Sequence, residues 1–237
     1  MRARIVLLIA VGLSLGGCGG SAILRMPEHD PARQPLRPFR EVGLTGAFAA
    51  VVPRGELNDV ADAGLAGGGS LELPVRSWLM LGVEYTHNEF LPPDVWTYYE
   101  IYEHLDISRT TDQLSIAGTW LLPVLFQDNR TPFTGGVYLR GRAGTARMRI
   151  DYPMVPGSER VTESVSGGAY GLGAGLYGLS PISRGVLGHF FATIGTMINW
   201  MSLDEQNGLG FDRSLPSARW MEYRIALGLF FDLKRNQ

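Results

Sequence analysis

The sequence predicts an all-β fold, an eight-stranded antiparallel up-and-down transmembrane β-barrel. Eight Gly-rich segments, in which apolar residues alternate with small or polar ones, follow one another along the 237 residues. The links between them are alternately short and long, as in closed barrels of outer membranes, which have short periplasmic turns and long external loops. An even number of strands also returns both chain ends to the side of the short turns. These observations together predict the fold and its topology.

The expected strands and links follow from where the alternation stops and turn residues begin. We expect strands near residues 41–52, 64–74, 78–90, 113–123, 133–150, 165–179, 188–202 and 219–233. The shorter links are 74–77, 123–131 and 180–187, and the longer ones are 53–63, 91–112, 151–164 and 203–218.

The last expected strand shows the alternation best. Its lipid-type face is Met221, Tyr223, Ile225, Leu227, Leu229, Phe231 and Leu233, and the residues between include Glu222, Arg224, Ala226, Gly228 and Asp232. In a membrane barrel every second side chain meets lipid and the others meet the lumen. Aromatic residues near the strand ends predict two interfacial girdles. The periplasmic girdle would hold Trp78, Trp120, Phe133, Tyr177, Phe190 and Phe231, and the outer one Tyr85, Phe90, Tyr170, Trp200, Trp220 and Tyr223.

On these patterns, residues 41–234 resemble the small eight-stranded outer-membrane β-barrel proteins, of the outer-membrane protein A and W type. The segment Gly228 to Leu233 is similar to the C-terminal assembly signal of that class, with Phe231 and Leu233 as its final apolar pair. Ala226 stands where that signal has a polar residue, and residues 234–237 extend past its usual end. The resemblance implies an architecture that hosts several functions.

The N-terminus predicts export. Two arginines, a short apolar run and small residues precede Cys18, the only cysteine of the chain, as in a secretory signal peptide. The run Leu15-Gly16-Gly17-Cys18 resembles the lipobox of bacterial lipoproteins, which implies a covalent lipid on Cys18. The expected domains are therefore a signal peptide (1–17), a Pro- and Arg-rich lipid-anchored tether (18–40) and the barrel (41–234).

Charged residues occur on the inward-facing positions of several expected strands. They are Glu72, Glu84, Arg140, Arg142, Glu222 and Arg224. The interior of an eight-stranded barrel is just wide enough for side chains, and buried charges must be paired. We therefore expect a lumen plugged by salt bridges; a gated narrow pore or a proton-linked path is the alternative.

The long link 91–112 is the most distinctive external segment. Trp96, Tyr98, Tyr99 and Tyr102 interleave there with acidic residues, which predicts either a recognition surface or a cap over the barrel. His87 could act as a general base on a lipid ester, yet the serine spacing of outer-membrane lipid hydrolases is missing around it. The histidines are too dispersed for a metal site, no cofactor motif occurs, and the near-neutral charge gives no case for nucleic-acid binding.

The leading hypothesis is a non-enzymatic outer-membrane barrel lipoprotein with a structural or surface-interaction role. Its expected partners are membrane lipids, the lipid on Cys18 and an extracellular ligand or surface partner. Both chain ends would be periplasmic and the long loops extracellular. The alternatives are a barrel that binds or transports a small hydrophobic molecule, a lipid-modifying enzyme and a lipocalin-like carrier.

Overall fold

The computed structural model describes residues 36–59, 61–91, 108–122, 126–127, 134–153, 160–182, 187–202 and 217–233. Its elements are β1 (Glu41–Arg54), the 3-10 helix η2 (Gly55–Asp59), β2 (Asp62–Arg76), β3 (Leu79–Leu91), β4 (Ser108–Leu121), β5 (Phe126–Gln127), β6 (Thr134–Pro153), β7 (Arg160–Pro181), β8 (Leu187–Ser202) and β9 (Ser217–Asp232). All strand pairings are antiparallel. Within the described ranges, no helix has the length and apolarity needed to cross a membrane.

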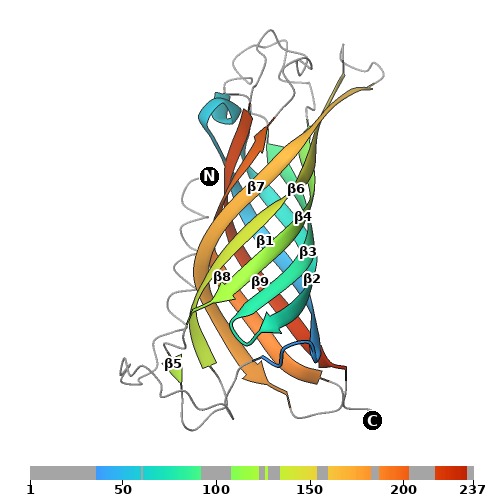
Figure 1. Ribbon diagram of the computed structural model, residues 1–237. Helices are drawn as coiled ribbons and strands as arrows, with labels where there is room; N and C mark the ends of the chain where they lie inside the picture. Colours follow the sequence, from blue (N-terminus) through green and yellow to red (C-terminus); the bar gives the residue numbers. More distant parts are fainter. Residues whose placement is uncertain are drawn as a thin grey trace.

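The sheet closes on itself into a barrel. β1 pairs with β2 on one side and with β9 on the other, and β4 pairs with β6, so that eight strands form a ring in the order β1-β2-β3-β4-β6-β7-β8-β9 (Figure 1). The short β5 stays outside this ring and pairs only with Thr134 and Gly135 at the start of β6. The predicted eight-stranded, up-and-down antiparallel barrel is therefore confirmed.

The barrel has two distinct mouths. We call the one at the bottom of Figure 1 the lower mouth: β1 begins there at Glu41, β9 ends there at Asp232, and these two residues are paired. The upper mouth carries η2 and the protruding end of the β6–β7 hairpin (Figure 1). Because consecutive strands are antiparallel neighbours, the links alternate between the mouths: those after β2, β4 and β7 start at the lower mouth, and those after β1, β3, β6 and β8 start at the upper mouth.

The outer wall of the barrel is apolar. Side chains alternate along each strand between the lumen and the outside, as the sequence predicts. On the outside, Ile116 of β4 is 70% exposed, Leu172 of β7 is 64% exposed, and Tyr223, Ile225 and Leu227 of β9 continue the same surface. A soluble protein rarely exposes so large a continuous apolar area.

Two expected strand boundaries are wrong. β4 begins at Ser108 instead of 113, and β7 begins at Arg160 instead of 165, so most of the expected long link 151–164 is strand. At the end of the β6–β7 hairpin the outward face is polar, so the outward apolar row of the barrel wall is missing there. The inward face still carries Met148, Ile150 and Val165. Polar cross-strand contacts hold it: Arg147 Nη2 donates to Ser164 Oγ at 2.8 Å, and Thr162 Oγ1 donates to Asp151.

Three aromatic residues expected in the interfacial girdles lie inside the barrel instead. Phe90, Tyr177 and Trp220 are almost completely buried, and Phe90 and Trp220 pack edge to face with ring centroids 6.3 Å apart. Trp220 lies an even number of residues from the inward-facing Glu222 on β9, and Phe90 lies an even number from the inward-facing Glu84 on β3, so both point to the lumen. We call this alternation of faces strand parity. Strand parity therefore directs these three side chains into the lumen, although they lie near strand ends, where aromatic residues could face the membrane interface.

The interior of the barrel has three layers. The upper one is an apolar cluster that includes Leu57 of η2, Phe90, Met148 and Trp220. The lower one is an apolar cluster that includes Leu36, Tyr138, Phe191 and Phe230. Buried charged residues lie between these two clusters, and they form the candidate functional site.

Candidate functional site

The central layer of the lumen consists of charged side chains from four strands. All six residues predicted from the sequence point inward and are buried: Glu72 (β2), Glu84 (β3), Arg140 and Arg142 (β6), and Glu222 and Arg224 (β9). They point inward because each occupies one of the alternate positions of its strand that face the lumen. The structure brings all six into one network, which we call the central ion layer.

Glu84 is the hub of the central ion layer, because its carboxylate contacts three arginines. Arg140 donates to Oε2 from Nη2 at 2.8 Å and from Nε at 3.2 Å. Arg142 Nη1 donates to Oε1 at 3.1 Å, and Arg224 Nη1 donates to the same oxygen. A single carboxylate of β3 therefore anchors guanidinium groups from β6 and β9.

The two remaining carboxylates balance this excess of positive charge. Arg140 Nη1 donates to Glu72 Oε1 at 2.7 Å, and Arg142 Nη2 donates to Glu222 Oε1 at 2.6 Å. Three carboxylates thus face three guanidinium groups, so the layer is neutral as a whole. Charge-assisted hydrogen bonds of this kind are the strongest that side chains form.

Neutral side chains add further hydrogen bonds to these charges. Asn199 of β8 accepts a hydrogen bond from Arg142 Nη2 at 2.8 Å and donates to Glu222 Oε1 at 3.0 Å. Trp220 Nε1 donates to the same Glu222 oxygen at 3.1 Å, and Thr119 accepts from Arg140. These three residues were not predicted from the sequence. Their inward parity was the available signal, but uncharged residues of that parity are too numerous to single out.

The energetics of the layer follow from its burial. Removing charged groups from water is costly, and attraction between them offsets the cost only when geometry and additional hydrogen bonds are good. Each carboxylate of the network accepts at least two hydrogen bonds, although Oε2 of Glu72 and Oε2 of Glu222 have no partner among the described atoms. The network joins strands that are not neighbours in the sheet. It therefore connects opposite parts of the barrel wall through side chains. Loss of one charged member would leave the buried layer with a net charge.

Little space remains around this layer. A small internal space of about 10 Å³ lies between Glu72, Tyr138 and Arg140, close to the volume that one water needs. A pocket for a drug-sized molecule usually has some 300–1,000 Å³. Among the described side chains, the central layer is thus filled by protein.

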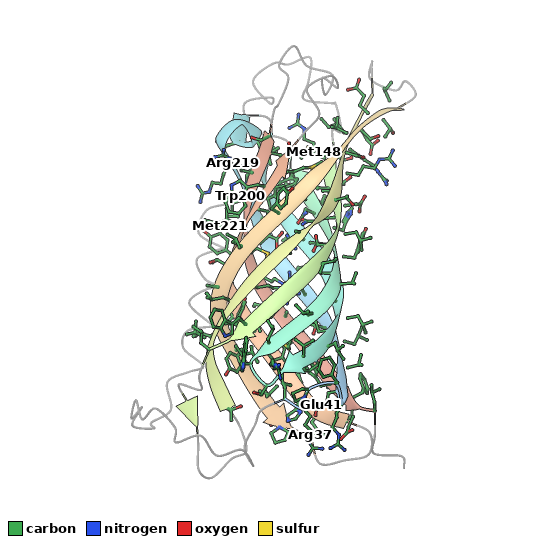
Figure 2. The ribbon with its side chains drawn as sticks, viewed as in Figure 1. Arg37, Glu41, Met148, Trp200, Arg219 and Met221 are labelled. Carbon is green, nitrogen blue, oxygen red and sulfur yellow. The ribbon has the colours of Figure 1, made fainter. Side chains whose placement is uncertain are left out.

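The lower mouth is closed by the segment that precedes β1. Leu36 is fully buried in the lower apolar cluster, and Arg37 Nη1 donates to Asp232 Oδ2 at 3.0 Å (Figure 2). Glu41 is also buried, with its carboxylate oxygens 2.9 and 3.1 Å from His189 Nδ1. Residues 36–40 belong to the tether expected from the sequence, and the structure shows that these last tether residues plug the barrel.

His87 lies on the outer wall near the upper end of β3. Its Nδ1 is 2.8 Å from Asp112 Oδ1 of β4, and Tyr85 donates to the same oxygen at 2.6 Å. Within the described ranges, no serine hydroxyl is hydrogen-bonded to His87, and no group of three or more potential metal ligands occurs. Cys18 and the aromatic residues Trp96, Tyr98, Tyr99 and Tyr102 lie outside the described residues.

Comparison with known proteins gives matches at the level of structure only. No family model matches the chain, and no curated protein matches it in sequence. Solved structures that resemble it include Neisserial surface protein A, with 12% identity, a TM-score of 0.48, and coverage of 81% of this chain and 96% of that one. Ail, the attachment invasion locus protein of Yersinia pestis, has 11% identity, a TM-score of 0.46 and coverage of 81% and 99%.

A third similar structure is a major outer membrane protein from Thermus thermophilus, with 13% identity, a TM-score of 0.40, and coverage of 81% of this chain and 99% of that one. At these identities a likeness concerns the fold alone. The barrel architecture of this chain follows from its own strand pairings, and its function is argued from its own residues.

Proposed function

We propose that this chain is an outer-membrane β-barrel with a structural or surface-interaction role and a lumen that does not conduct. The observation that carries this proposal is the inverted distribution of side chains: apolar residues cover the outside, and charged residues fill the inside. A soluble barrel would have the opposite arrangement, with its charged face toward water. In a bilayer an apolar exterior is favourable, and a closed barrel leaves no backbone group unpaired in lipid.

The extent of the apolar wall supports the membrane location. On β9 the outward apolar row runs from Met221 to Phe231. At a rise of about 3.3 Å per residue and a tilt of about 40°, such a row covers about 25 Å. That length matches the apolar band of outer-membrane barrels.

The filled lumen supports a role that does not depend on passage through the barrel. The central ion layer lies between two apolar clusters, and Leu36 fills the lower mouth. An ion entering from either side would have to displace apolar side chains and then break the charge-assisted bonds around Glu84. We expect the unmodified barrel to have no steady conductance.

The external end of the β6–β7 hairpin supports a surface-interaction role. β7 pairs with β8 only from Ala169 onward, so residues 160–168 pair with β6 alone. The hairpin projects beyond the neighbouring strands at the upper mouth (Figure 1). In the proposed orientation the upper mouth is extracellular, the lower mouth is periplasmic, and the lipid on Cys18 would lie on the periplasmic side.

Membrane insertion is tested by heat-modifiable gel migration and vesicle flotation, comparing the natural chain with Cys18→Ser. A fast-migrating unboiled band that floats with vesicles in both proteins is the expected result. Release of Cys18→Ser into the soluble fraction would contradict the proposal, because the lipid alone would then hold the protein. A steady channel current from the inserted natural chain in planar bilayers would contradict the non-conducting lumen.

Orientation is tested with single cysteines, because Cys18 is the only natural one. In the Cys18→Ser background, Thr162→Cys on the hairpin should react with a membrane-impermeant maleimide on intact cells. Arg76→Cys at the lower end of β2 should react only after the outer membrane is opened. The reverse pattern would show that the hairpin faces the periplasm and would remove the basis for a surface role.

A further inference from the structure

One row of outward side chains near the upper mouth is basic and aromatic, whereas the rest of the outer wall is mostly aliphatic. Arg54 of β1 is paired with Arg219 of β9, Arg219 with Trp200 of β8, and Trp200 with Tyr170 of β7. Figure 2 shows Trp200, Arg219 and Met221 together on the upper outer wall. The row therefore places two arginines side by side, followed by two aromatic residues.

The two arginines are an unfavourable combination without a third group. Directly opposed residues of an antiparallel pair have Cβ atoms about 5 Å apart, and like charges at that distance repel. Both side chains are exposed, and neither forms an ion pair or hydrogen bond with another side chain among those that the structure describes. Among the side chains that the structure describes, nothing balances this paired positive charge.

The other outward basic residues at the upper end of the barrel provide a contrast. Arg149 Nη2 lies 3.5 Å from Asp112 Oδ2, and His87 Nδ1 lies 2.8 Å from the other oxygen of the same carboxylate. Arg147 donates to Ser164. On that side of the barrel these basic groups have polar partners, whereas on the β1–β9 side no described side chain provides one.

The height of the arginine pair on the wall indicates what balances it. Arg219 is the next outward residue of β9 above Met221, where the apolar row of about 25 Å ends. Trp200 lies beside Arg219, and tryptophan and tyrosine favour the boundary between acyl chains and headgroups. In a membrane, Arg54 and Arg219 would therefore lie at the level of the lipid phosphates.

We propose that Arg54 and Arg219 together bind the phosphate group of an anionic lipid in the outer leaflet, with Trp200 contacting the lipid beside it. Two guanidinium groups on adjacent strands offer several N–H donors to one phosphate, and a phosphate monoester carries enough charge to balance both. The lipid would cover the apolar wall below with its acyl chains. This inference rests on the proposed membrane location.

The test measures lipid binding to the folded barrel in detergent micelles by native mass spectrometry. The probe is dioleoyl phosphatidic acid, and the comparison lipid is dioleoyl phosphatidylcholine, which has the same chains and no net charge. The test variant is Arg54→Gln/Arg219→Gln, and the matched control is Arg147→Gln/Arg149→Gln, which removes the same charge elsewhere on the wall. Heat-modifiable migration establishes that each variant folds.

We expect the test variant to bind phosphatidic acid at least about tenfold more weakly than the natural chain, while the control variant stays within about twofold. Binding of phosphatidylcholine should not change. If the test variant does not fold, Arg219→Gln alone should still weaken binding of phosphatidic acid more than Arg149→Gln does.

Equal losses in both double variants would overturn the proposal, because general attraction would then explain binding. Competition by inorganic phosphate at the concentration of the lipid would assign the site to free phosphate and also overturn it. Vesicle flotation of the natural chain separates this inference from the proposed function. A chain that floats without preferring phosphatidic acid refutes only the lipid site, and a chain that does not float refutes the membrane location.

Discussion

Arg140 and Glu84 meet inside the barrel through two nitrogen atoms and one oxygen: Nη2 and Nε of the arginine lie 2.8 and 3.2 Å from Oε2 of the glutamate. The two residues belong to β6 and β3, which are separated in the sheet by β4. Their contact therefore acts across the lumen and adds a connection that backbone pairing does not provide.

Glu84→Gln should destabilise the barrel strongly. The substitution keeps the shape of the side chain but removes the charge that three buried arginines share, and breaking a buried ion pair costs about 3–5 kcal/mol. The free energy of unfolding is measured by urea titration of the barrel in detergent. Glu89→Gln, on the exposed face of the same strand, should change it by less than about 0.5 kcal/mol.

Arg142 and Glu222 should show strong energetic coupling. Their ion pair at 2.6 Å is fully buried, so Arg142→Met and Glu222→Leu should each leave the central ion layer with a net buried charge. The double variant restores neutrality and should cost less than the two single changes together, by about 1–3 kcal/mol in a double-mutant cycle. Additive losses would show that the pair does not act as a unit. Arg142→Met combined with Glu89→Gln provides an additive control.

Leu36→Ala should destabilise the barrel by about 2–5 kcal/mol, because Leu36 is fully buried in the lower apolar cluster. Phe39→Ala is the matched control, since the Phe39 ring is 63% exposed on the same turn and should contribute less than about 0.5 kcal/mol. Unfolding in urea measures both. A Leu36→Ala barrel as stable as the natural chain would show that the segment before β1 does not hold the lower mouth closed.

Gly175→Ala should destabilise the barrel, because an added Cβ would lie 2.8 Å from Cε1 of Tyr138 and closer still to the backbone of β8. Gly175 and its partner Gly195 thus leave room for the Tyr138 ring inside the lumen. Gly67→Ala is the control, because its added Cβ would meet open space. We expect the loss of stability, followed by thermal unfolding, to exceed about 1 kcal/mol only for Gly175→Ala.

Strand parity explains why the sequence predicts the barrel and the central ion layer well. A charged residue on an inward position, such as Glu84 or Arg142, has no other place to point once the apolar face of its strand is known. Partner choice is different, because it depends on how strands far apart in the chain are placed around the ring. That Glu84 would accept from β6 and β9 at once could not be predicted.

Two features escaped prediction for separate physical reasons. The external end of the β6–β7 hairpin has a polar outward face, so it lacks the outward apolar row of a membrane strand, although Met148 and Ile150 alternate on its inward face. Leu36 is one of a few unevenly spaced apolar residues in a Pro- and Arg-rich segment, and such spacing sets no period. Its burial is determined by the geometry of the lower mouth, which exists only after the barrel has formed.

The pairing of β1 with β9 has a consequence for biogenesis. Fourteen residues of β1, from Glu41 to Arg54, are matched to β9 from Asp232 back to Arg219. A nascent chain that lacks β9 therefore has a strand edge exposed at each end of its sheet, and neither can be satisfied in lipid. The ring can therefore close only after β9, the last strand, has been synthesised.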